Sequence, residues 1–404
     1  MGTGRKHAAA GLIISAVLVA ACSDQPTAPR SIAPALTIGV VKPGLSSPQW
    51  QQRARALVSA NNQSPVAAGR TYAALSVAQY RAVKAADKQL PAAGRTSGNG
   101  YGAGGRSNFE MQRGAVAGAS AVVLSFLYPS AAAALEQQVD AEGQAGPGNV
   151  HPSFTKGEVI GRIVGQAMVT HLMNDGSSLP FTGTVPVGPQ YWIPTPTMAG
   201  ANLGGVTPYF LNSTSQFRSA PPPALASAEF TTDLNEVVNI AAARTPQQIA
   251  IAQFWAFGGG TPTPLGYWNQ VAADYIAEAG LDERAATHVF ALMHGAQFDA
   301  QLGCFETKYH YWTVRPYQVV SITTALAPPP HPSYPSGHSC ISASAAHVLA
   351  YFFPQKTAEL DALVAEAGVS RIYAGIHYRF DLTAGKILGT TVADWAIARD
   401  QASQ

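Results

Sequence analysis

Three short segments in the C-terminal part of the chain hold residues that could bind and transform an oxyanion. The first, CFETKYHYWTVRP, places Lys308 seven residues before Arg315. Seven residues make about two helical turns and leave the side chains only about 20° out of phase, so both cations can share one face of a helix that Pro316 ends. The surrounding residues are bulky and mostly apolar, where unpaired cations would be unfavourable. We therefore expect both cations to face a bound anion.

The second segment, HPSYPSGHS, stands directly before a run of small residues with helical character. Pro335 can precede a helix, Ser336 can cap it, and Gly337 lets the backbone approach a ligand closely. His338 then lies in the first helical turn. A helix N-terminus with a free hydroxyl and open backbone N–H groups attracts an oxyanion, although such a tetrapeptide alone is also compatible with an ordinary capped loop.

The third segment, SRIYAGIHYRFD, pairs His377 with Asp381 four residues later. This spacing predicts that both share one helix face and that the carboxylate accepts a hydrogen bond from the imidazole and selects its tautomer. Arg371 would lie about 120° from the histidine on a continuous helix, so we expect a helix boundary near residues 368–370. Asp299, upstream of the first segment, is a candidate partner for a site cation.

Together the segments supply three cations, two neutral donors and two imidazoles, which suits a tetrahedral, multiply charged oxyanion. Their order resembles the signature of the type 2 phosphatidic acid phosphatase and vanadium haloperoxidase superfamily: Lys, six residues, Arg-Pro; then Pro-Ser-Gly-His; then Ser-Arg, five residues, His, three residues, Asp. Every spacing is matched within residues 308–381. The resemblance implies an enzyme with an α-helical bundle fold, similar to the soluble exported bacterial haloperoxidase-like branch.

The resemblance implies two chemistries for one set of residues. The set that would hold vanadate is Lys308, Arg315, Ser336, Gly337, Arg371 and His377. In a haloperoxidase, His377 would be the axial ligand to vanadium, and His338 would handle protons while peroxide oxidises halide. In an acid phosphatase, which needs no cofactor, His377 would become a phosphohistidine, Asp381 would orient it, and His338 would protonate the leaving alcohol.

Residues outside the core motif favour the haloperoxidase. HPSYPSGH and GIHYRFD resemble the corresponding stretches of algal vanadium bromoperoxidases, and His331 matches a second pocket histidine of that group, where chloroperoxidases have Phe. The resemblance therefore implies bromide rather than chloride, although on the residues alone His331 is an ordinary loop histidine. Acid phosphatase is the alternative. A third hypothesis, a non-catalytic oxyanion-binding lipoprotein, has no use for the complete set of His338, His377 and Asp381.

The elements that must position these residues are predicted to be helices. Apolar or alanine residues recur at three- and four-residue spacing over residues 50–176, 228–275 and 282–314. Residues 177–224 are rich in Pro, Gly and aromatics, which predicts an ordered loop packed on the helices. Alternating strand patterns are nearly absent. We predict an all-α fold, a helical bundle with long Pro/Gly-rich connections, as a single domain over residues 50–404.

The N-terminal segment has the features of an export signal. A basic start precedes a short apolar run, and VAAC resembles a bacterial lipobox, so residues 1–21 are a predicted signal peptide with Cys22 lipidated. An ordinary signal peptide cut near Ala21 is the alternative. Residues 22–49, rich in Pro, Ser and Ala, are predicted to form a flexible tether. We expect an exported protein of the periplasm or cell envelope that touches the membrane only through this anchor.

Composition narrows the class of partner. The 404 residues carry 25 Lys and Arg against 23 Asp and Glu, a net charge of +2, which argues against nucleic acid and leaves small molecules as the expected partners. Nothing in the sequence indicates an oligomeric state. Cys304 and Cys340 are the only cysteines after Cys22. They flank the site segments, and both a disulfide and two buried thiols are compatible with their positions.

Overall fold

The computed structural model describes residues 1–2, 44–89, 103–144 and 150–403. The chain divides into two units, Met1–Pro34 and Ala35–Gln404, and every helix named below lies in the second. The predicted export signal, the lipobox with Cys22, and the predicted tether up to residue 43 lie outside the described residues.

The described part of the second unit is all-α, as the sequence predicted, and its only β-type pairing is an isolated bridge between Tyr191 and Thr313. The α-helices are α1 (Ser47–Ala60), α2 (Pro65–Lys88), α3 (Ala103–Leu127), α4 (Ala132–Gly143), α5 (Pro152–Met173), α6 (Ala228–Ala242), α7 (Pro246–Phe254), α8 (Thr263–Glu278), α9 (Glu283–Tyr311), α10 (Pro316–Val319), α11 (Gly337–Phe352), α12 (Thr357–Tyr373) and α13 (Arg379–Ala402). Short 3-10 turns are η2 (Pro129–Ala131), η3 (Leu203–Gly205) and η4 (Pro354–Lys356). None of the described helices combines the length and apolar character that a bilayer span requires.

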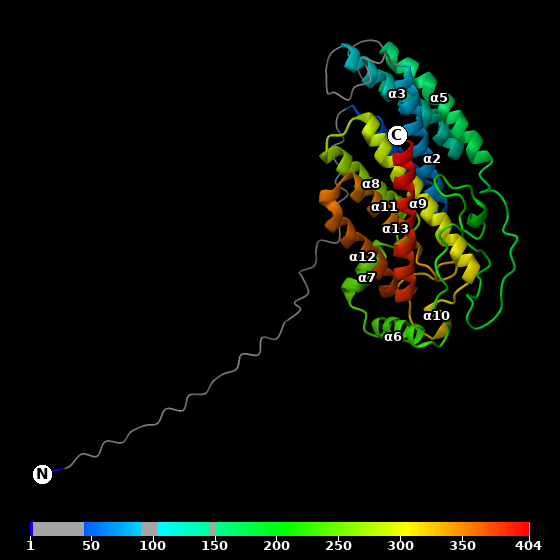
Figure 1. Ribbon diagram of the computed structural model, residues 1–404, viewed down its shortest axis with the longest axis vertical. Helices are drawn as coiled ribbons and strands as arrows, with labels where there is room; N and C mark the ends of the chain where they lie inside the picture. The colour runs from blue at the N-terminus through cyan, green and yellow to red at the C-terminus, as the bar shows by residue number, and fades with distance from the viewer. Residues whose placement is uncertain (3–43, 90–102, 145–149, 404) are drawn as a thin grey trace. The chain divides into compact units, whose positions relative to one another are not determined.

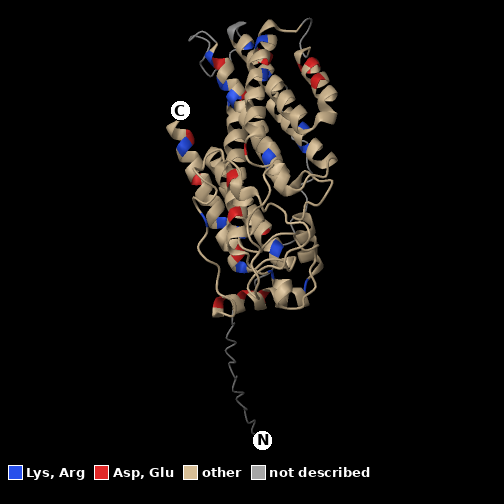
Figure 2. Cartoon of the chain, turned by 90° about the vertical axis from the view of Figure 1, so that its right-hand side faces the viewer, with Lys and Arg blue, Asp and Glu red and all other residues tan. Residues whose placement is uncertain are grey.

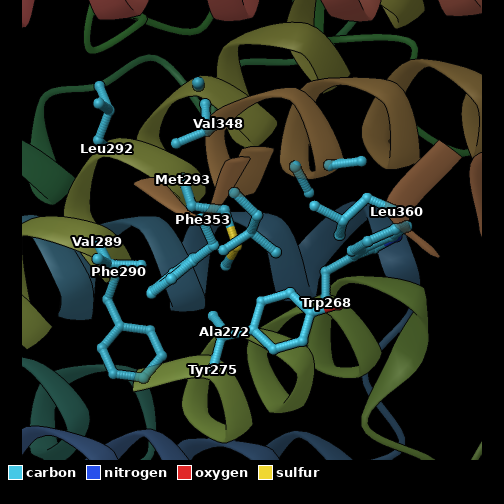
Figure 3. Close-up of a cluster of buried hydrophobic side chains, with 14 of the residues drawn as sticks. Trp268, Ala272, Tyr275, Val289, Phe290, Leu292, Met293, Val348, Phe353 and Leu360 are labelled. Carbon is cyan, nitrogen blue, oxygen red and sulfur yellow. The ribbon is translucent and has the colours of Figure 1, made fainter. Parts of the chain in front are cut away.

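Helix α9 is the centre of the packing. It is buried along most of its length and contacts α2, α11 and α13, and the last two run beside it in Figure 1. The largest apolar cluster joins Trp268 of α8, Phe290 of α9, Val348 of α11 and Leu360 of α12 (Figure 3). Burial of such side chains is the main favourable contribution to folding, and here it fixes the helices that carry the three motif segments relative to one another.

Helices α3 and α5 approach each other backbone to backbone. A Cβ added at Gly157 would lie 1.9 Å from the carbonyl oxygen of Met111, and one at Gly161 would lie 2.1 Å from that of Ala115. Only glycine allows this separation, which accounts for the four-residue glycine spacing in α5.

The fold begins earlier than the sequence indicated. Helix α1 starts at Ser47, and the backbone N–H groups of Ser46 and Ser47 donate to the buried carboxylate of Glu283 at 2.7 and 2.8 Å. Leu45 is buried as well. The predicted boundary near Trp50 is therefore corrected, because a Pro- and Ser-rich composition resembles a linker although these residues are held by a distant carboxylate.

The long connection between α5 and α6 is ordered by Asp299. Its carboxylate accepts hydrogen bonds from the backbone N–H groups of Tyr209, Phe210 and Leu211 at 2.7–2.9 Å. Burial raises the pKa of Asp299 to about 6. The expectation that Asp299 pairs with a site cation is wrong, since both oxygens are engaged by the loop backbone.

Charged side chains are sparse and of both signs along the described helices (Figure 2). This distribution agrees with the small net charge of +2. Against this sparse distribution, the three buried cations Lys308, Arg315 and Arg371, one or two from each of two motif segments, form a local concentration of positive charge.

Candidate active site

The first motif segment leaves its helix before Arg315. Trp312 adopts a left-handed conformation, with φ 54°, and ends α9, while Arg315 is extended and precedes α10. The prediction that Lys308 and Arg315 share one helix face is therefore wrong. Between Trp312 and Arg315 the chain instead runs beside another segment, and Val314 N–H donates to Gln190 O at 3.0 Å.

Both cations nevertheless converge on the second motif segment. Lys308 Nζ donates to the carbonyl oxygens of Pro332, Ser333 and Pro335, at 2.9, 2.7 and 2.5 Å. The guanidinium of Arg315 donates to the His331 carbonyl at 2.9 and 3.1 Å. These carbonyls orient the cations but bring no full negative charge.

Helix α11 begins where the sequence predicted. Ser336 is its N-cap residue and its hydroxyl accepts from Ser339 N–H, while its own N–H donates to Asp381 O at 2.9 Å. A Cβ added at Gly337 would meet no heavy atom within 4 Å. The space beside Gly337, in the first turn of α11, is therefore open, and His338 is the next residue of that turn. The positive end of the α11 dipole and the open space beside Gly337 together suit a bound anion.

The third motif segment is split between two helices. Helix α12 runs through residues 368–370 and ends at Tyr373, so the predicted boundary is wrong; the chain reverses at Gly375, whose φ of +78° favours glycine. His377 precedes α13, and Asp381 lies in the first turn of that helix. They do not share a helix face, yet His377 Nδ1 lies 2.7 Å from Asp381 Oδ2, as expected for the pair.

Asp381 is engaged by more than the imidazole. Its Oδ2 also accepts from Ser333 Oγ at 2.6 Å and from Tyr378 N–H at 3.1 Å. Ser333 thus joins the carboxylate to Lys308 through its own carbonyl. The sequence did not predict a role for Ser333; its place between Pro332 and Pro335 was the only signal, and its burial is visible only in the structure.

The C-terminal turn of α7 completes the site and was also missed. Arg371 Nη2 donates to Ala252 O at 2.9 Å, and His338 Nε2 lies 2.7 Å from Trp255 O. Both acceptors are backbone carbonyls at the negative end of a helix, a favourable place for cations. Because every residue carries such a carbonyl, no residue type could have revealed them.

The three cations are buried without a counter-ion. Lys308 and Arg315 are 0% exposed and Arg371 is 3% exposed. None of them forms an ion pair with a carboxylate among the described residues. Burial lowers the pKa of Lys308 to about 8 and that of Arg371 to about 9, and it also lowers the pKa of Arg315. An anion bound here would relieve this electrostatic cost.

The same environment keeps His377 neutral. Burial, with Arg315 and Lys308 nearby, holds its pKa well below the usual range. Burial also raises the pKa of Asp381 to about 6. The contact with Asp381 assigns the proton to Nδ1 and leaves a lone pair on Nε2, which accepts from Arg315 Nη1 at 3.2 Å. A neutral Nε2 can act as a ligand or as a nucleophile.

His331 lies in the same cluster. Its Nδ1 is 3.0 Å from Arg315 Nη2, and its ring packs edge-on against Phe305 with centroids 5.1 Å apart. Burial and the two nearby cations, Lys308 and Arg315, hold the pKa of His331 well below the usual range. His331 is therefore a neutral pocket residue and not a free loop histidine.

Cys304 and Cys340 are both buried free thiols in this structure. Cys304 Sγ lies 3.8 Å from Pro335 O, the carbonyl that also accepts from Lys308. Of the two arrangements compatible with the sequence, the structure has the thiols.

Comparison with known proteins agrees with the motif. The family model "PAP2 superfamily" matches residues 288–403. A curated undecaprenyl-diphosphatase from Sulfolobus acidocaldarius is 35% identical over 89 residues, which are 22% of this chain and 43% of that protein. This chain therefore spans less than half of the curated relative that it matches.

Solved structures match over far more of the chain. A bacterial vanadium-dependent iodoperoxidase aligns with a TM-score of 0.71 and 23% identity, over 88% of this chain and 96% of that one. A holo-type bacterial vanadium-dependent chloroperoxidase aligns with a TM-score of 0.67 and 16% identity, over 86% and 96%. The fold is thus that of the bacterial vanadium haloperoxidases. Residues 288–403, which hold all three motif segments, thus match the PAP2 superfamily model, and the fold shared with the haloperoxidases extends over most of the chain.

Proposed function

We propose that the chain is a vanadium-dependent haloperoxidase that oxidises halide with hydrogen peroxide, and bromide rather than chloride. One observation carries the proposal: three cations are buried without an ion-pair partner among the described residues, and all three act on His377, whose Nε2 lone pair accepts from Arg315 Nη1. Vanadate and phosphate have the shape and charge for this site. The structural likeness to an iodoperoxidase and a chloroperoxidase, over 86–88% of the chain, favours vanadate.

Each residue has a defined task in this proposal. Lys308, Arg315 and Arg371 neutralise the oxyanion. The Ser336 hydroxyl and the Gly337 N–H would donate to it, and Nε2 of His377 would be a ligand, because Asp381 binds the Nδ1 proton and leaves the lone pair on Nε2. Bound vanadate supplies the activation of hydrogen peroxide towards halide.

His338 handles protons at the edge of the same site. Its Nε2 is occupied by Trp255 O, so Nδ1 is the atom that takes and releases a proton. His331, in contact with Arg315, is the residue on which the preference for bromide rests. Peroxide and halide are small molecules, consistent with the superfamily and with the small net charge.

Acid phosphatase is the second candidate, favoured by the similarity to the undecaprenyl-diphosphatase. In that reaction Nε2 of His377 attacks phosphorus, so that a P–N bond forms and the ester P–O bond breaks. For this step His338 must carry a proton on Nδ1 as well, which it gives to the leaving oxygen. The neutral Nδ1 then accepts a proton from the water that attacks phosphorus and cleaves the P–N bond, which restores the protonated ring. The two candidates need the same residues and differ in what occupies the site.

A paired assay separates the candidates. The purified chain is tested for bromination of a phenol dye with vanadate, peroxide and bromide, with iodide and chloride in parallel, and for hydrolysis of an aryl phosphate without vanadate. Halogenation that depends on vanadate supports the haloperoxidase. Phosphate release without halogenation would refute it, and inactivity in both assays would leave oxyanion binding as the function.

We also propose that the enzyme is exported and anchored by a lipid on Cys22. The lipobox-like VAAC and the apolar run before it support this proposal. Cells producing the full chain should incorporate labelled fatty acid into it and retain it in the membrane fraction, whereas Cys22→Ala should lose the label. Equal labelling of both chains would contradict the proposal.

A further inference from the structure

The proton-handling histidine is held by a residue that is itself held from a distance. Trp255 O lies 2.7 Å from His338 Nε2. The indole of the same residue is fully buried, and its Nε1–H donates to Glu366 Oε1 at 2.9 Å. Two hydrogen bonds, one to the indole and one to the backbone carbonyl of Trp255, therefore link Glu366 in α12 to His338 in α11 through the covalent structure of Trp255.

This link depends on how α7 meets α12. The two helices are joined by the Trp255–Glu366 bond and by the bond from Arg371 to Ala252 O, both 2.9 Å long. The second bond holds the last turn of α7 but not the residue after it. Trp255 is that residue. Its own N–H donates to Ile251 O at 3.1 Å, and the bond from its side chain to Glu366 is the further restraint on the position of this residue and its carbonyl.

Aromatic packing limits how far the indole can move but gives no hydrogen bond. Phe254, Phe257 and Tyr267 surround Trp255, with ring centroids 5.5, 6.0 and 5.1 Å away. Such contacts restrain a ring less specifically than a hydrogen bond to a charged acceptor. Loss of the Glu366 acceptor therefore loosens the carbonyl without removing the packing.

The direction of the Trp255 carbonyl decides the tautomer of His338. With the carbonyl in place, the proton of the neutral ring lies on Nε2 and Nδ1 keeps its lone pair. The groups around the ring, Arg371, Lys308 and the neutral His331, supply no competing carboxylate. The hydrogen bond to Trp255 is thus the main influence that selects Nε2–H.

We propose that Glu366 is a positioning residue for His338: it holds the Trp255 indole, and the Trp255 carbonyl in turn keeps His338 in the Nε2–H tautomer with Nδ1 available to the reaction. This proposal depends on the proposed function only in its statement that His338 exchanges protons in the haloperoxidase reaction. The tautomer itself is a property of the resting protein.

The test reads the tautomer directly. The full chain is labelled with ¹⁵N-histidine, the His338 signals are assigned by their loss in His338→Gln, and the Nδ1 and Nε2 shifts are compared. In Glu366→Ala the ratio of Nε2–H to Nδ1–H should fall about fivefold, because the neutral hydrogen bond from His338 to the Trp255 carbonyl is then weakened or lost. Trp255→Phe, which removes the indole donor, should give the same change, and the double variant should add nothing.

Two further variants make the result decisive. Glu366→Gln keeps an acceptor oxygen and should retain the wild-type ratio, and Asp361→Ala removes an exposed carboxylate from the same helix and should leave it unchanged. An unchanged ratio in Glu366→Ala overturns the proposal. So does a Gln variant that shifts as far as the Ala variant, since the charge and not the bond would then be acting. Absence of halide oxidation would refute the proposed function but leave this tautomer test intact.

Discussion

The two imidazoles of the site are held by different kinds of partner. His377 is held by the carboxylate of Asp381, four residues away, which receives two further hydrogen bonds from Ser333 and Tyr378. His338 is held by the carbonyl of Trp255, a residue 83 positions away in sequence. An ionisable partner stabilises charge on the ring it holds, whereas a carbonyl mainly sets the tautomer. The first support suits a ligand or nucleophile, and the second suits a group that exchanges protons.

Removing each ring is the strongest test of this comparison. His377→Ala should abolish halogenation and phosphate hydrolysis, with a loss of at least ~10³-fold, because the variant removes the imidazole assigned as ligand or nucleophile. His338→Ala should lower kcat by ~10²–10⁴-fold but leave oxyanion affinity near the wild-type value. The exposed His310 provides the control, His310→Ala. Activity that survives in His377→Ala would refute the assigned roles.

Both imidazoles depend on the same buried cations. Lys308→Ala and Arg371→Ala should each weaken vanadate and phosphate binding by at least ~30-fold, because each removes a desolvated charge from the anion. Isothermal titration measures the affinities. Lys386, exposed on α13, gives a matched control as Lys386→Ala. If the affinity falls equally in Lys386→Ala, the loss reflects the overall charge of the protein and not a binding site formed by Lys308 and Arg371.

The oxyanion affinity should also depend on pH. Burial lowers the pKa of Lys308 to about 8, so its ammonium is present below that pH and is lost as the pH rises through it. Affinity should therefore fall above about pH 8, approaching tenfold per unit for one proton. Lys308→Met should bind weakly and lose the part of this dependence that begins near pH 8, while the part due to Arg371, whose pKa is about 9, remains. A wild-type affinity that stays constant from pH 7 to 9.5 would contradict the assignment.

The smallest expected effect concerns Ser333, which donates a hydrogen bond to Asp381, the partner of His377. Ser333→Ala removes one donor from Asp381, which should raise the pKa of that carboxyl further and move the acid limb of the activity profile to higher pH. The loss of kcat should be about 5–10-fold. Ser344 has a buried hydroxyl with no hydrogen-bond partner, so Ser344→Ala is the control. If the pH profile of activity moves in both variants, or in neither, Ser333 does not contribute specifically to holding His377 through Asp381.

Much of this site could be predicted from the sequence because its residues carry chemistry in their side chains. Lys308, Arg371 and the N-cap Ser336 of α11 were expected from residue type and spacing. In the structure Lys308 and Arg371 both act electrostatically on His338, two residues after Ser336. The errors concern backbone conformation. The left-handed Trp312 and the turn at Gly375 place Arg315 and His377 outside the helices that the spacing implied.

The sequence by itself determined the all-α class, the motif spacing, and the set of charged and hydrogen-bonding groups. Only the tertiary structure decided that the three cations are buried without a carboxylate, that Asp299 serves a loop, and that carbonyls of α7 face Arg371 and His338. The physical reason is that burial and backbone acceptors belong to the packed fold. A carbonyl has the same chemistry in every residue, and only the contact between α7 and α12 makes these two part of the site.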